Sequence, residues 1–409
     1  MVSTCRCRRL VLLTGCVVAN VLVGLYAVPA LLALTRLGDV NTASSQVSPS
    51  STSTMVLGNT LRTSGEDGTR HGRRYDELMY GYTLEPPDSV HGRYCDRLSP
   101  ANQTVLIVVC SAVENIDRRN AIRSTWGDTG RLTAAGVSLV FLVARTDPGR
   151  SPPGIERRVA AEYRHQGDVV QADFIDDYVN LTAKTVAALR WAARACPRVS
   201  YVMKSDDDVY VNLAALTRRL EAERTTQIST FNLDDAAARA FIMGQVVDSA
   251  RPVRDRRSRW YTPTSIYPAE FYPPYTSGTG YVLGASVVRR LVALVDAKLS
   301  VFRPFWLEDV YVTGMLATGL PDVRLVHDAN FNFRPTLRSR GRRRRTSSSD
   351  EDEEICGYRD AITVHDLTPT ELVRLWKRLR LVASRCTDDE LEYDREDSDN
   401  DDDGLYSNI

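Results

Sequence analysis

Lysine is scarce in this sequence, and neither sign of charge is in excess. Only four of the 52 basic residues are Lys, and 52 acidic residues balance them. Balanced charge argues against a general nucleic-acid binder, which needs a basic surface. Because arginine is used almost everywhere else, a remaining lysine can mark a position that requires a compact ammonium group, or can be an ordinary surface residue. The four are Lys184, Lys204, Lys298 and Lys377.

Cys-x-x-Cys pairs are missing after residue 36, so a cysteine zinc site is not expected there. Three of the eight cysteines lie within the first 16 residues, and the other five are Cys95, Cys110, Cys196, Cys356 and Cys386. An oxidising compartment would allow these five to form disulfides, and since five is odd we expect one free thiol. Cys110 lies inside the apolar run VLIVVC and could be a small buried hydrophobe.

Only one apolar run is long enough to matter for membranes. Residues 10–34 carry no charge and lie between flanking arginines, and about this length crosses a bilayer as a helix. The alternative, a cleaved signal peptide, normally has an apolar region of about 7–15 residues. We therefore predict one transmembrane signal-anchor at 10–34, with residues 1–9 in the cytosol and the remainder in the lumen or outside.

The charged and polar segments predict the boundaries of the folded part. Residues 35–90 are rich in Ser, Thr and Gly and predict a largely disordered stem in front of a folded domain at 91–386. Residues 335–354, arginines followed by acids, predict a charged insertion, and residues 387–409 predict an acidic disordered tail. Asn102 and Asn180 begin Asn-x-Thr sequons and are candidate glycosylation sites.

From Thr104 onward, short β-branched apolar runs alternate with helix-like segments. Strands are expected at TVLIVVCS, GVSLVFLVAR, DVVQADF and VSYVMKSD, with helical patterns between them. This alternation predicts an α/β domain whose open, mainly parallel sheet is flanked by helices. In such sheets ligands bind beyond the carboxyl ends of the strands.

Three consecutive aspartates, Asp206, Asp207 and Asp208, follow the last of these strands. Adjacent carboxylates repel one another, and a divalent cation that prefers oxygen ligands removes the conflict. Such a cluster suits a nucleotide sugar, because one carboxylate can bind Mn²⁺ or Mg²⁺ while another contacts the ribose or a metal-bound water. Phosphatases and nucleases also use acidic clusters, and a solvated acidic turn is the other reading.

Basic residues surround this motif in the sequence. Lys204 immediately precedes SDDD, and Lys184 lies on the predicted helix before that strand, so either could offset the acidic charge or contact phosphate. In DRRNAIRSTWGD, arginines spaced by about one helical turn could present guanidinium groups to a diphosphate, or could form an exposed basic helix face. These arginines are Arg118, Arg119 and Arg123.

A second acidic pair, Glu308 and Asp309, lies between aromatics and an amphipathic run. An inverting sugar transfer needs a carboxylate that takes the proton from the acceptor hydroxyl, and Asp309 is the candidate base, with Glu308 supporting acceptor placement. The alternative is an acid pair that interacts with a helix dipole.

The stretch RWYTPTSIYPAEFYPPYTSGTGYVLG could form an aromatic wall on which an acceptor sugar stacks, with glycines that let the backbone come close, or could be ordinary packing. The acceptor candidates in it are Tyr275, Gly278, Gly280 and Tyr281. His365, after a short strand, could supply an imidazole ligand to a carboxylate-bound metal, or could be structural. His327 is its rival.

Six motifs in order resemble the β-1,3-galactosyltransferase and β-1,3-N-acetylglucosaminyltransferase family of Golgi type II membrane enzymes, glycosyltransferase family 31. They cover roughly residues 100–385 and are ENIDRRNAIRSTWG, DFIDDYVNLTAKT, YVMKSDDDVYVN, SRWYTPTSIYPAEFYPPYTSGTGYVLG, EDVYVTG and ITVHDLTPTEL. The resemblance implies a GT-A-type nucleotide-sugar-binding fold, a UDP-sugar donor, Mn²⁺ or Mg²⁺, inversion, and a β-1,3 bond to a glycoprotein or glycolipid acceptor. It also implies a Golgi membrane location with the catalytic domain in the lumen, and a homo-oligomer is possible.

The resemblance assigns roles to single residues. It implies that Asp208 and His365 bind the metal, that Asp206 and Asp207 complete the acidic motif, that Arg119, Arg123 and Asp176 contact the donor nucleotide, and that Asp309 is the base. Thr276 stands where the family often has Cys, so a disulfide at that position is not expected. Galactose is the favoured sugar, with N-acetylglucosamine or N-acetylgalactosamine as alternatives.

Two alternative functions from other classes of protein also fit the sequence. A catalytically silent, lectin-like Golgi protein would keep the fold, and a metal-dependent phosphoesterase would account for the triple aspartate alone.

Overall fold

The computed structural model describes residues 78–89, 92, 94–96, 103–297, 304–331, 355–382 and 386. All of them lie in the second of two compact units, which spans residues 67–409. Within these described ranges, no helix is both long enough and apolar enough to cross a bilayer. The predicted anchor at 10–34, the charged insertion at 335–354 and the acidic tail at 387–409 lie outside them.

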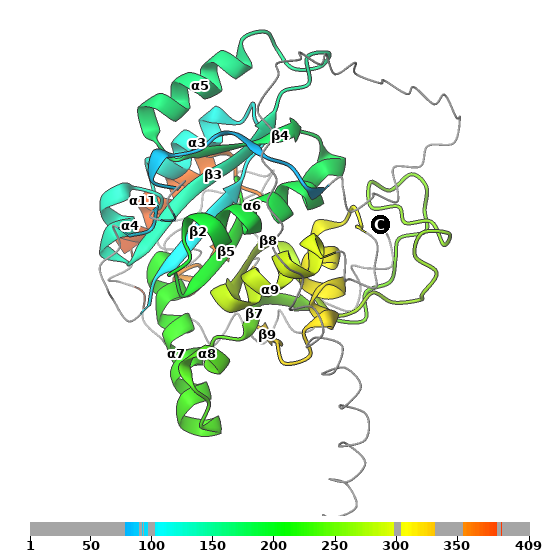
Figure 1. Cartoon of the computed structure of the whole chain (residues 1–409). Coiled ribbons are helices and arrows are strands. Elements are labelled where there is room, and N and C mark those ends of the chain that lie inside the picture. The colour runs from blue at the N-terminus through cyan, green and yellow to red at the C-terminus, as the bar shows by residue number, and fades with distance from the viewer. Residues whose placement is uncertain are drawn as a thin grey trace, which may run out of the picture. The chain divides into compact units, whose positions relative to one another are not determined.

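One eight-stranded sheet, in the order β1-β4-β3-β2-β5-β8-β7-β9, forms the centre of this unit (Figure 1). The four strands expected from the sequence are present and run parallel, which confirms the mainly parallel α/β sheet. β8 runs antiparallel to both of its neighbours, an orientation that the sequence did not predict. The strands are β1 (Tyr82–Leu84), β2 (Val105–Cys110), β3 (Val137–Arg145), β4 (Val169–Ile175), β5 (Tyr201–Asp206), β7 (Phe241–Val247), β8 (Tyr275–Gly284) and β9 (Arg324–His327).

Strand β2 shows why the middle of the sheet is buried on both faces. All six of its residues, VLIVVC, are buried. Because successive side chains of a strand point to opposite faces, its even-numbered residues enter one core cluster and its odd-numbered residues enter another. A continuous apolar run of this kind is typical of a parallel strand covered by helices on both sides.

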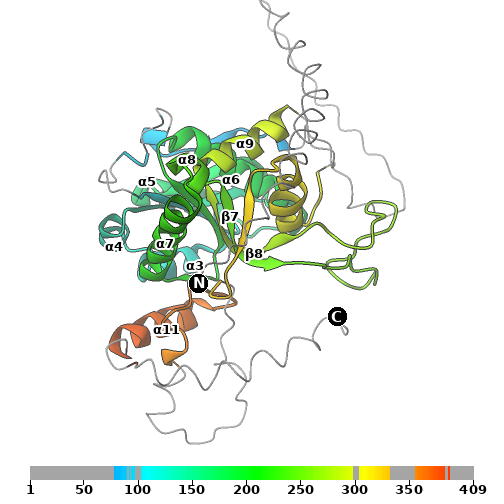
Figure 2. The same ribbon diagram turned by 90° about the horizontal axis from the view of Figure 1, so that it is seen from below.

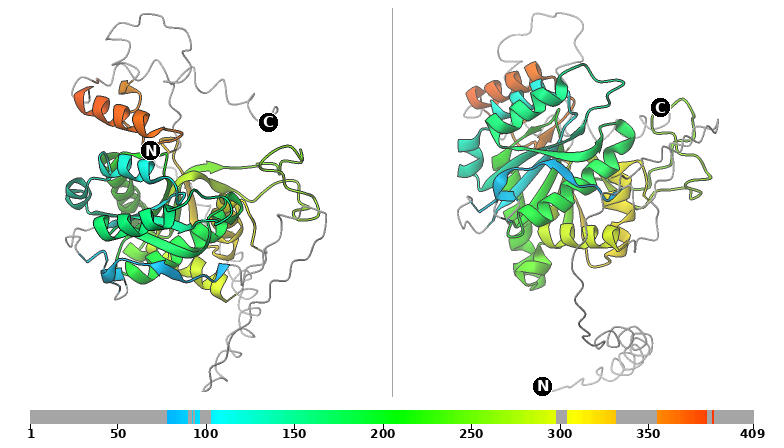
Figure 3. Two further views of the ribbon diagram at one scale, coloured as in Figure 1. Left: turned by 90° about the horizontal axis from the view of Figure 1, so that it is seen from above. Right: turned by 45° about the horizontal axis from the view of Figure 1, so that its top comes forward.

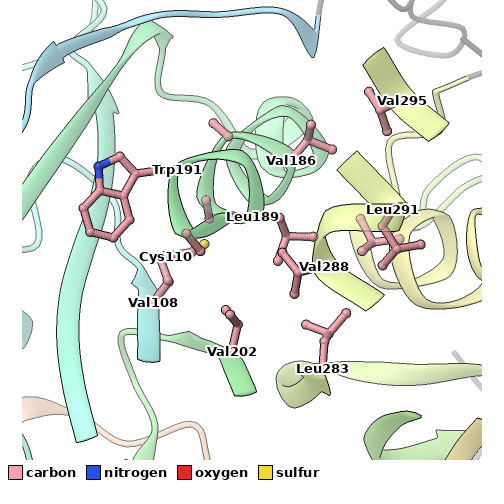
Figure 4. Close-up of a cluster of buried hydrophobic side chains, with 14 of the residues drawn as sticks. Val108, Cys110, Val186, Leu189, Trp191, Val202, Leu283, Val288, Leu291 and Val295 are labelled. Atoms are coloured by element: carbon pink, nitrogen blue, oxygen red, sulfur yellow. The ribbon is translucent and has the colours of Figure 1, made fainter. Parts of the chain in front are cut away.

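Two helices, α6 (Leu181–Ala195) and α9 (Ala285–Asp296), cover the first face. Figure 4 shows their side chains, with Val186, Leu189 and Leu291 among them, packed over residues of the sheet such as Val202. The second face carries α3 (Ile116–Arg123), α7 (Leu213–Phe231) and α11 (Pro369–Val382). α11 lies on the side of the molecule away from α6 and α9 (Figure 3).

The remaining elements are short or peripheral. α5 packs against β3 and β4 in a small third cluster. A two-stranded sheet, β6 (Tyr210–Val211) with β10 (Thr363–Val364), joins the C-terminal part to the acidic triplet. The other elements are η2 (Pro87–Ser89), α4 (Thr129–Ala134), α5 (Ile155–Gln166), η3 (Tyr178–Asn180), α8 (Asp235–Ala238), the π-helix η4 (Val310–Met315) and η5 (Ala317–Gly319).

The folded body begins earlier than the predicted boundary at residue 91. Leu78 is fully buried in the first core, and β1 pairs antiparallel with β4. The Tyr82 hydroxyl donates to the carbonyl of Ala187 at 2.7 Å. The last part of the predicted stem is therefore an edge strand of the sheet, since it finds hydrogen-bond and apolar partners that its own polar composition did not reveal.

The five cysteines outside the N-terminal segment behave as expected from their odd number. Cys95 pairs with Cys196, Cys356 pairs with Cys386, and Cys110 is a buried free thiol. Burial raises the pKa of the Cys110 thiol to about 12, which keeps it protonated and unreactive.

Gly284, where β8 gives way to α9, leaves no room for a side chain. A Cβ atom there would lie 1.9 Å from the carbonyl oxygen of Arg239, which belongs to the backbone. We expect Gly284→Ala to lower the free energy of unfolding by about 3 kcal/mol, because the backbone must shift. Gly81→Ala is the matched control, since nothing lies within 4 Å of its Cβ position. Urea unfolding of both variants checks this, and equal stabilities would contradict it.

Candidate functional site

The acidic triplet lies where the carboxyl ends of β2 and β5 meet. Cys110 and Asp206 are register partners in the parallel pair, so the residues after β2 lie beside Asp207. The Ser111 hydroxyl and the Asn115 side-chain amide donate to Asp207 Oδ2 at 2.7 and 2.9 Å. Asp207 is thereby held from the side of the β2–α3 loop.

The second acidic pair is brought to the same edge by β8. Gly278 donates its backbone N–H to Asp309 Oδ2 at 3.1 Å, and the Tyr281 hydroxyl donates to Glu308 Oε1 at 2.6 Å. A Cβ atom on Gly278 would lie 3.2 Å from Asp309 Oδ2, so glycine lets the strand approach the acids closely. The two acidic sites, about a hundred residues apart in sequence, therefore share one end of the sheet.

Lys204 connects the two acidic sites. Its buried ammonium group lies 2.6 Å from Asp206 Oδ1 and 3.3 Å from Glu308 Oε2, and it also donates to the Gly278 carbonyl. Burial alone would lower the pKa of Lys204, but the two carboxylates raise it, so the group stays charged. The expectation that Lys204 offsets the acidic charge fits this geometry, whereas direct contact with phosphate does not.

Burial shifts the carboxylates of the site toward protonation. It raises the pKa of Glu308 and of Asp309 above their ordinary values. The pKa of Asp208 rises to about 6, first through burial and then through the neighbouring Asp206, while Arg118 opposes the rise. Excess negative charge of this kind favours the arrival of a cation.

The C-terminal strand places a histidine next to the triplet. Val364 of β10 pairs with Tyr210 of β6, and the Leu367 N–H donates to the Asp208 carbonyl at 3.0 Å. The intervening His365 and Asp366 therefore lie beside Asp208, as the predicted metal role of His365 requires. The rival His327 instead accepts a hydrogen bond from the Val246 N–H through Nδ1 at 3.1 Å.

Arg119 and Arg123, predicted to contact the donor nucleotide, are bound to other carboxylates and do not contact the acidic triplet. The Arg119 side chain is fully buried and makes five hydrogen bonds, two of them to Glu162 at 2.8 Å. Arg123 forms a two-pronged pair with Asp168 and also contacts Glu162. The carboxylates that engage them lie about 40 residues away in sequence, so helical spacing alone could not reveal them.

Lys184 and Asp176 also form a scaffold pair, rather than offering free groups to a ligand. The buried Lys184 ammonium lies 2.5 Å from Asp176 Oδ1 and donates to the Ser111 carbonyl at 3.0 Å. The other Asp176 oxygen accepts from the Val113 N–H at 2.9 Å. Together they fasten the β2–α3 loop.

Most of the expected aromatic wall is internal packing. Tyr281 is fully buried on Glu308, and a Cβ on Gly280 would face Met203 and Thr363 inside the fold, so neither residue reaches an acceptor. Tyr275 is half-buried and its ring packs edge-on against Tyr272. The segment between β7 and β8 that precedes it projects from the body (Figure 2).

Glu308 also differs from its expected role. Its side chain is buried, with one oxygen on Tyr281 and the other on Lys204. It therefore joins β5, β8 and η4 and has no free oxygen directed at an acceptor. Asp309, which is half-buried, remains the acid of this pair that is open to one.

Asn180, a predicted glycosylation site, lies just before α6 and is partly exposed. Its side-chain amide donates to the Ile175 carbonyl at 2.7 Å, and the sequon hydroxyl of Thr182 is buried on the Phe305 carbonyl. The Thr182 hydroxyl is thus enclosed, whereas the hydrogen bond of Asn180 is exposed, and glycosylation of Asn180 stays a prediction. Asn102 lies outside the described residues.

Arg118 is the arginine of α3 that faces the acidic triplet. Its Nη1 lies 3.6 Å from Asp207 Oδ1 and 3.4 Å from Asp208 Oδ2. The RRNAIR motif contained this residue, but the step of about 100° between neighbouring helix positions sends adjacent side chains in different directions. Only the tertiary contacts show that Arg118 turns toward the site and Arg119 turns inward.

Comparison with known proteins gives a consistent family. Residues 117–328, about half of the chain, match the family model described as galactosyltransferase. Mouse β-1,3-galactosyltransferase 1 is 33% identical over 273 residues, which cover 66% of this chain and 72% of that protein. Human β-1,3-galactosyltransferase 2 is 29% identical over 331 residues, covering 79% of this chain and 68% of that protein.

Among solved structures, the apo form of mouse xyloside xylosyltransferase 1 aligns over 64% of this chain and 97% of that chain. Its sequence identity is 15% and its TM-score 0.28, which is too low to support an argument.

The scaffold role of Arg119 predicts a specific pattern of stability. Arg119→Met should lower the free energy of unfolding by about 3–5 kcal/mol, because it leaves Glu162 buried with one partner fewer. The double variant Arg119→Met, Glu162→Met should lose less than the sum of the two single variants. Denaturant unfolding of the full cycle measures this coupling, and simple additivity would show that the buried pair is not a unit.

Proposed function

The chain belongs to the galactosyltransferase family, and on that premise we propose that it transfers a hexose, galactose in the first instance, from a UDP-sugar to a glycan acceptor. The new bond is a β-1,3 linkage formed with inversion. The observation that carries this proposal is the meeting of two acidic sites at one sheet edge through Lys204. One site suits the donor diphosphate and the other suits the acceptor hydroxyl.

Asp309 is the proposed general base. It takes the proton from the acceptor hydroxyl, whose oxygen attacks the anomeric carbon while the carbon–oxygen bond to the diphosphate breaks and its electron pair leaves with UDP. Hydrogen bonds from the backbone N–H groups of Gly278 and Val310 hold the carboxylate in place. Glu308 fixes this geometry indirectly, through its contacts with Lys204 and Tyr281.

A divalent cation fits the donor set beside the leaving group. Asp208 is partly exposed, and its carboxylate oxygens can serve as metal ligands. The pairing of β10 with β6 holds His365 next to it. No three His, Cys, Asp or Glu side chains among the described residues form a ready-made metal cage. Oxygens of the donor diphosphate would therefore complete the coordination of Mn²⁺ or Mg²⁺, which supplies positive charge to the departing diphosphate when bound.

The proposed setting is the lumen of the Golgi, with residues 10–34 as a type II signal-anchor. Two disulfides, Cys95–Cys196 and Cys356–Cys386, support an oxidising compartment for the folded unit. A glycoprotein or glycolipid would be the acceptor.

The deciding experiment offers the purified protein UDP-galactose, UDP-N-acetylglucosamine and UDP-N-acetylgalactosamine with Mn²⁺ and a panel of glycan acceptors. Transfer from one donor identifies the sugar. Absence of transfer and of donor hydrolysis, despite binding of UDP, would favour a silent lectin-like protein. Turnover of simple phosphate esters would favour a phosphoesterase.

Substitutions at the two acidic sites should separate chemistry from donor binding. Asp309→Asn should lower kcat by about 10²–10⁴-fold and leave UDP binding intact, because it removes only the base. Asp208→Asn should abolish metal-dependent UDP binding as well as transfer. Asp322→Asn, which removes an exposed carboxylate paired with Arg290, is the control. Equal loss of UDP binding in both site variants would contradict the division of roles.

The raised pKa of Asp309 predicts the acid limb of the pH profile. The base works only when ionised, so kcat should fall as the pH drops through its pKa, and burial places that pKa above the ordinary value of 3.8. Rates measured at saturating donor and metal across the acidic range test this. A rate that stays constant down to the ordinary carboxyl range would contradict the assignment.

A further inference from the structure

Three arginines of α3 differ in how firmly the fold holds them. Arg119 makes five hydrogen bonds of 2.8–3.2 Å, and Arg123 has bonds of 2.7–3.0 Å to Asp168 and Asn120. Arg118 touches its two aspartates only at 3.4 and 3.6 Å, and its Nη1 makes no hydrogen bond among the described residues. Its ion pairs therefore lack the directional hydrogen bonds that hold Arg119 and Arg123.

Arg118 lies against the carboxylates to which a cation would bind. Its Nη1 contacts Oδ1 of Asp207 and Oδ2 of Asp208, so the two carboxylates share the single positive charge of one guanidinium. The side chains of Arg118 and Asp208 are 30% and 32% exposed, although the contacting Nη1 atom itself is buried. A second positive charge at Asp208 would be repelled by this guanidinium.

Asp207 does not depend on Arg118 to keep its position. Asp207 is held from behind by Ser111 and Asn115, and Ser111 in turn accepts from the buried Arg119 at 2.8 Å. Because arginine can only donate, this contact leaves the Ser111 hydroxyl proton for Asp207. The Asp207 carboxylate would therefore stay in place if Arg118 moved.

We propose that Arg118 is a resident counter-ion of the acidic triplet, which gives up Asp208 to the metal and moves to the donor diphosphate when both arrive. The inference rests on the proposed function. Its guanidinium fork suits phosphate oxygens, and its side chain is partly exposed. The exchange makes metal and nucleotide bind cooperatively, since the diphosphate removes the charge that opposes the metal.

The test compares Mn²⁺ affinity of the purified full-length protein with and without UDP, by electron paramagnetic resonance or calorimetry. In the wild-type protein UDP should tighten Mn²⁺ binding. Arg118→Gln should bind Mn²⁺ alone roughly tenfold more tightly than wild type, because a nearby positive charge is gone. In the same variant UDP should tighten Mn²⁺ less, and KM for the donor should rise roughly tenfold.

Two further variants serve as controls. Arg118→Lys keeps the charge and should retain wild-type affinity for Mn²⁺ alone, while the lost fork still raises KM for the donor. Arg158→Gln removes one exposed positive charge from α5 and should change neither quantity. Thermal unfolding of each variant confirms that it folds, and Arg118→Met replaces Arg118→Gln if that variant does not.

The outcomes separate this inference from the function on which it rests. If wild-type protein binds Mn²⁺ with UDP but Arg118→Gln binds Mn²⁺ alone no more tightly than wild type, the exchange is wrong and the transferase proposal stands. If wild-type protein binds no Mn²⁺ under any of these conditions, the metal assignment fails and the exchange fails with it.

Discussion

The buried ammonium of Lys204 is the interaction on which the site depends. It comes from β5, contacts a carboxylate at the end of its own strand, and reaches both the backbone of β8 and the acid pair before η4. Three segments separated in sequence are thereby joined by one charge. Without it, the buried Glu308 carboxylate would lose its cationic partner while a second carboxylate, Asp206, stayed nearby, and low-dielectric surroundings penalise such an arrangement strongly.

Buried charges recur around this centre, and each one positions a loop. Arg119 with Glu162 and Lys184 with Asp176 together hold three consecutive positions after β2, residues 111–113, through side-chain and backbone bonds. Loops usually carry function but little rigidity. Here the rigidity comes from ion pairs beneath the loop, whereas Arg118, Asp207 and Asp208 lie outside those pairs and contact one another.

The sequence predicted the sheet and the two acidic sites, because apolar period and strand-end position are local properties. It did not predict β1, whose three residues carry little pattern, or the direction of β8, which depends on the chain path between strands. It also assigned Arg119 rather than Arg118 to the site. The partners that decide that choice, Glu162 and Asp208, lie 43 and 90 positions away from the respective arginines, and no local spacing contains them.

The Cys356–Cys386 disulfide closes a loop of 30 residues that carries β10, His365 and α11. Both cysteines belong to the same arm of the chain, and the arm reaches the acidic triplet through its own strand pairing. The histidine is thus presented to the acidic triplet by a segment that is anchored twice, once by the pairing of β10 with β6 and once by a covalent link that encloses both the histidine and α11. A single covalent link in this arm therefore limits how far its strand, its histidine and its helix can separate from one another.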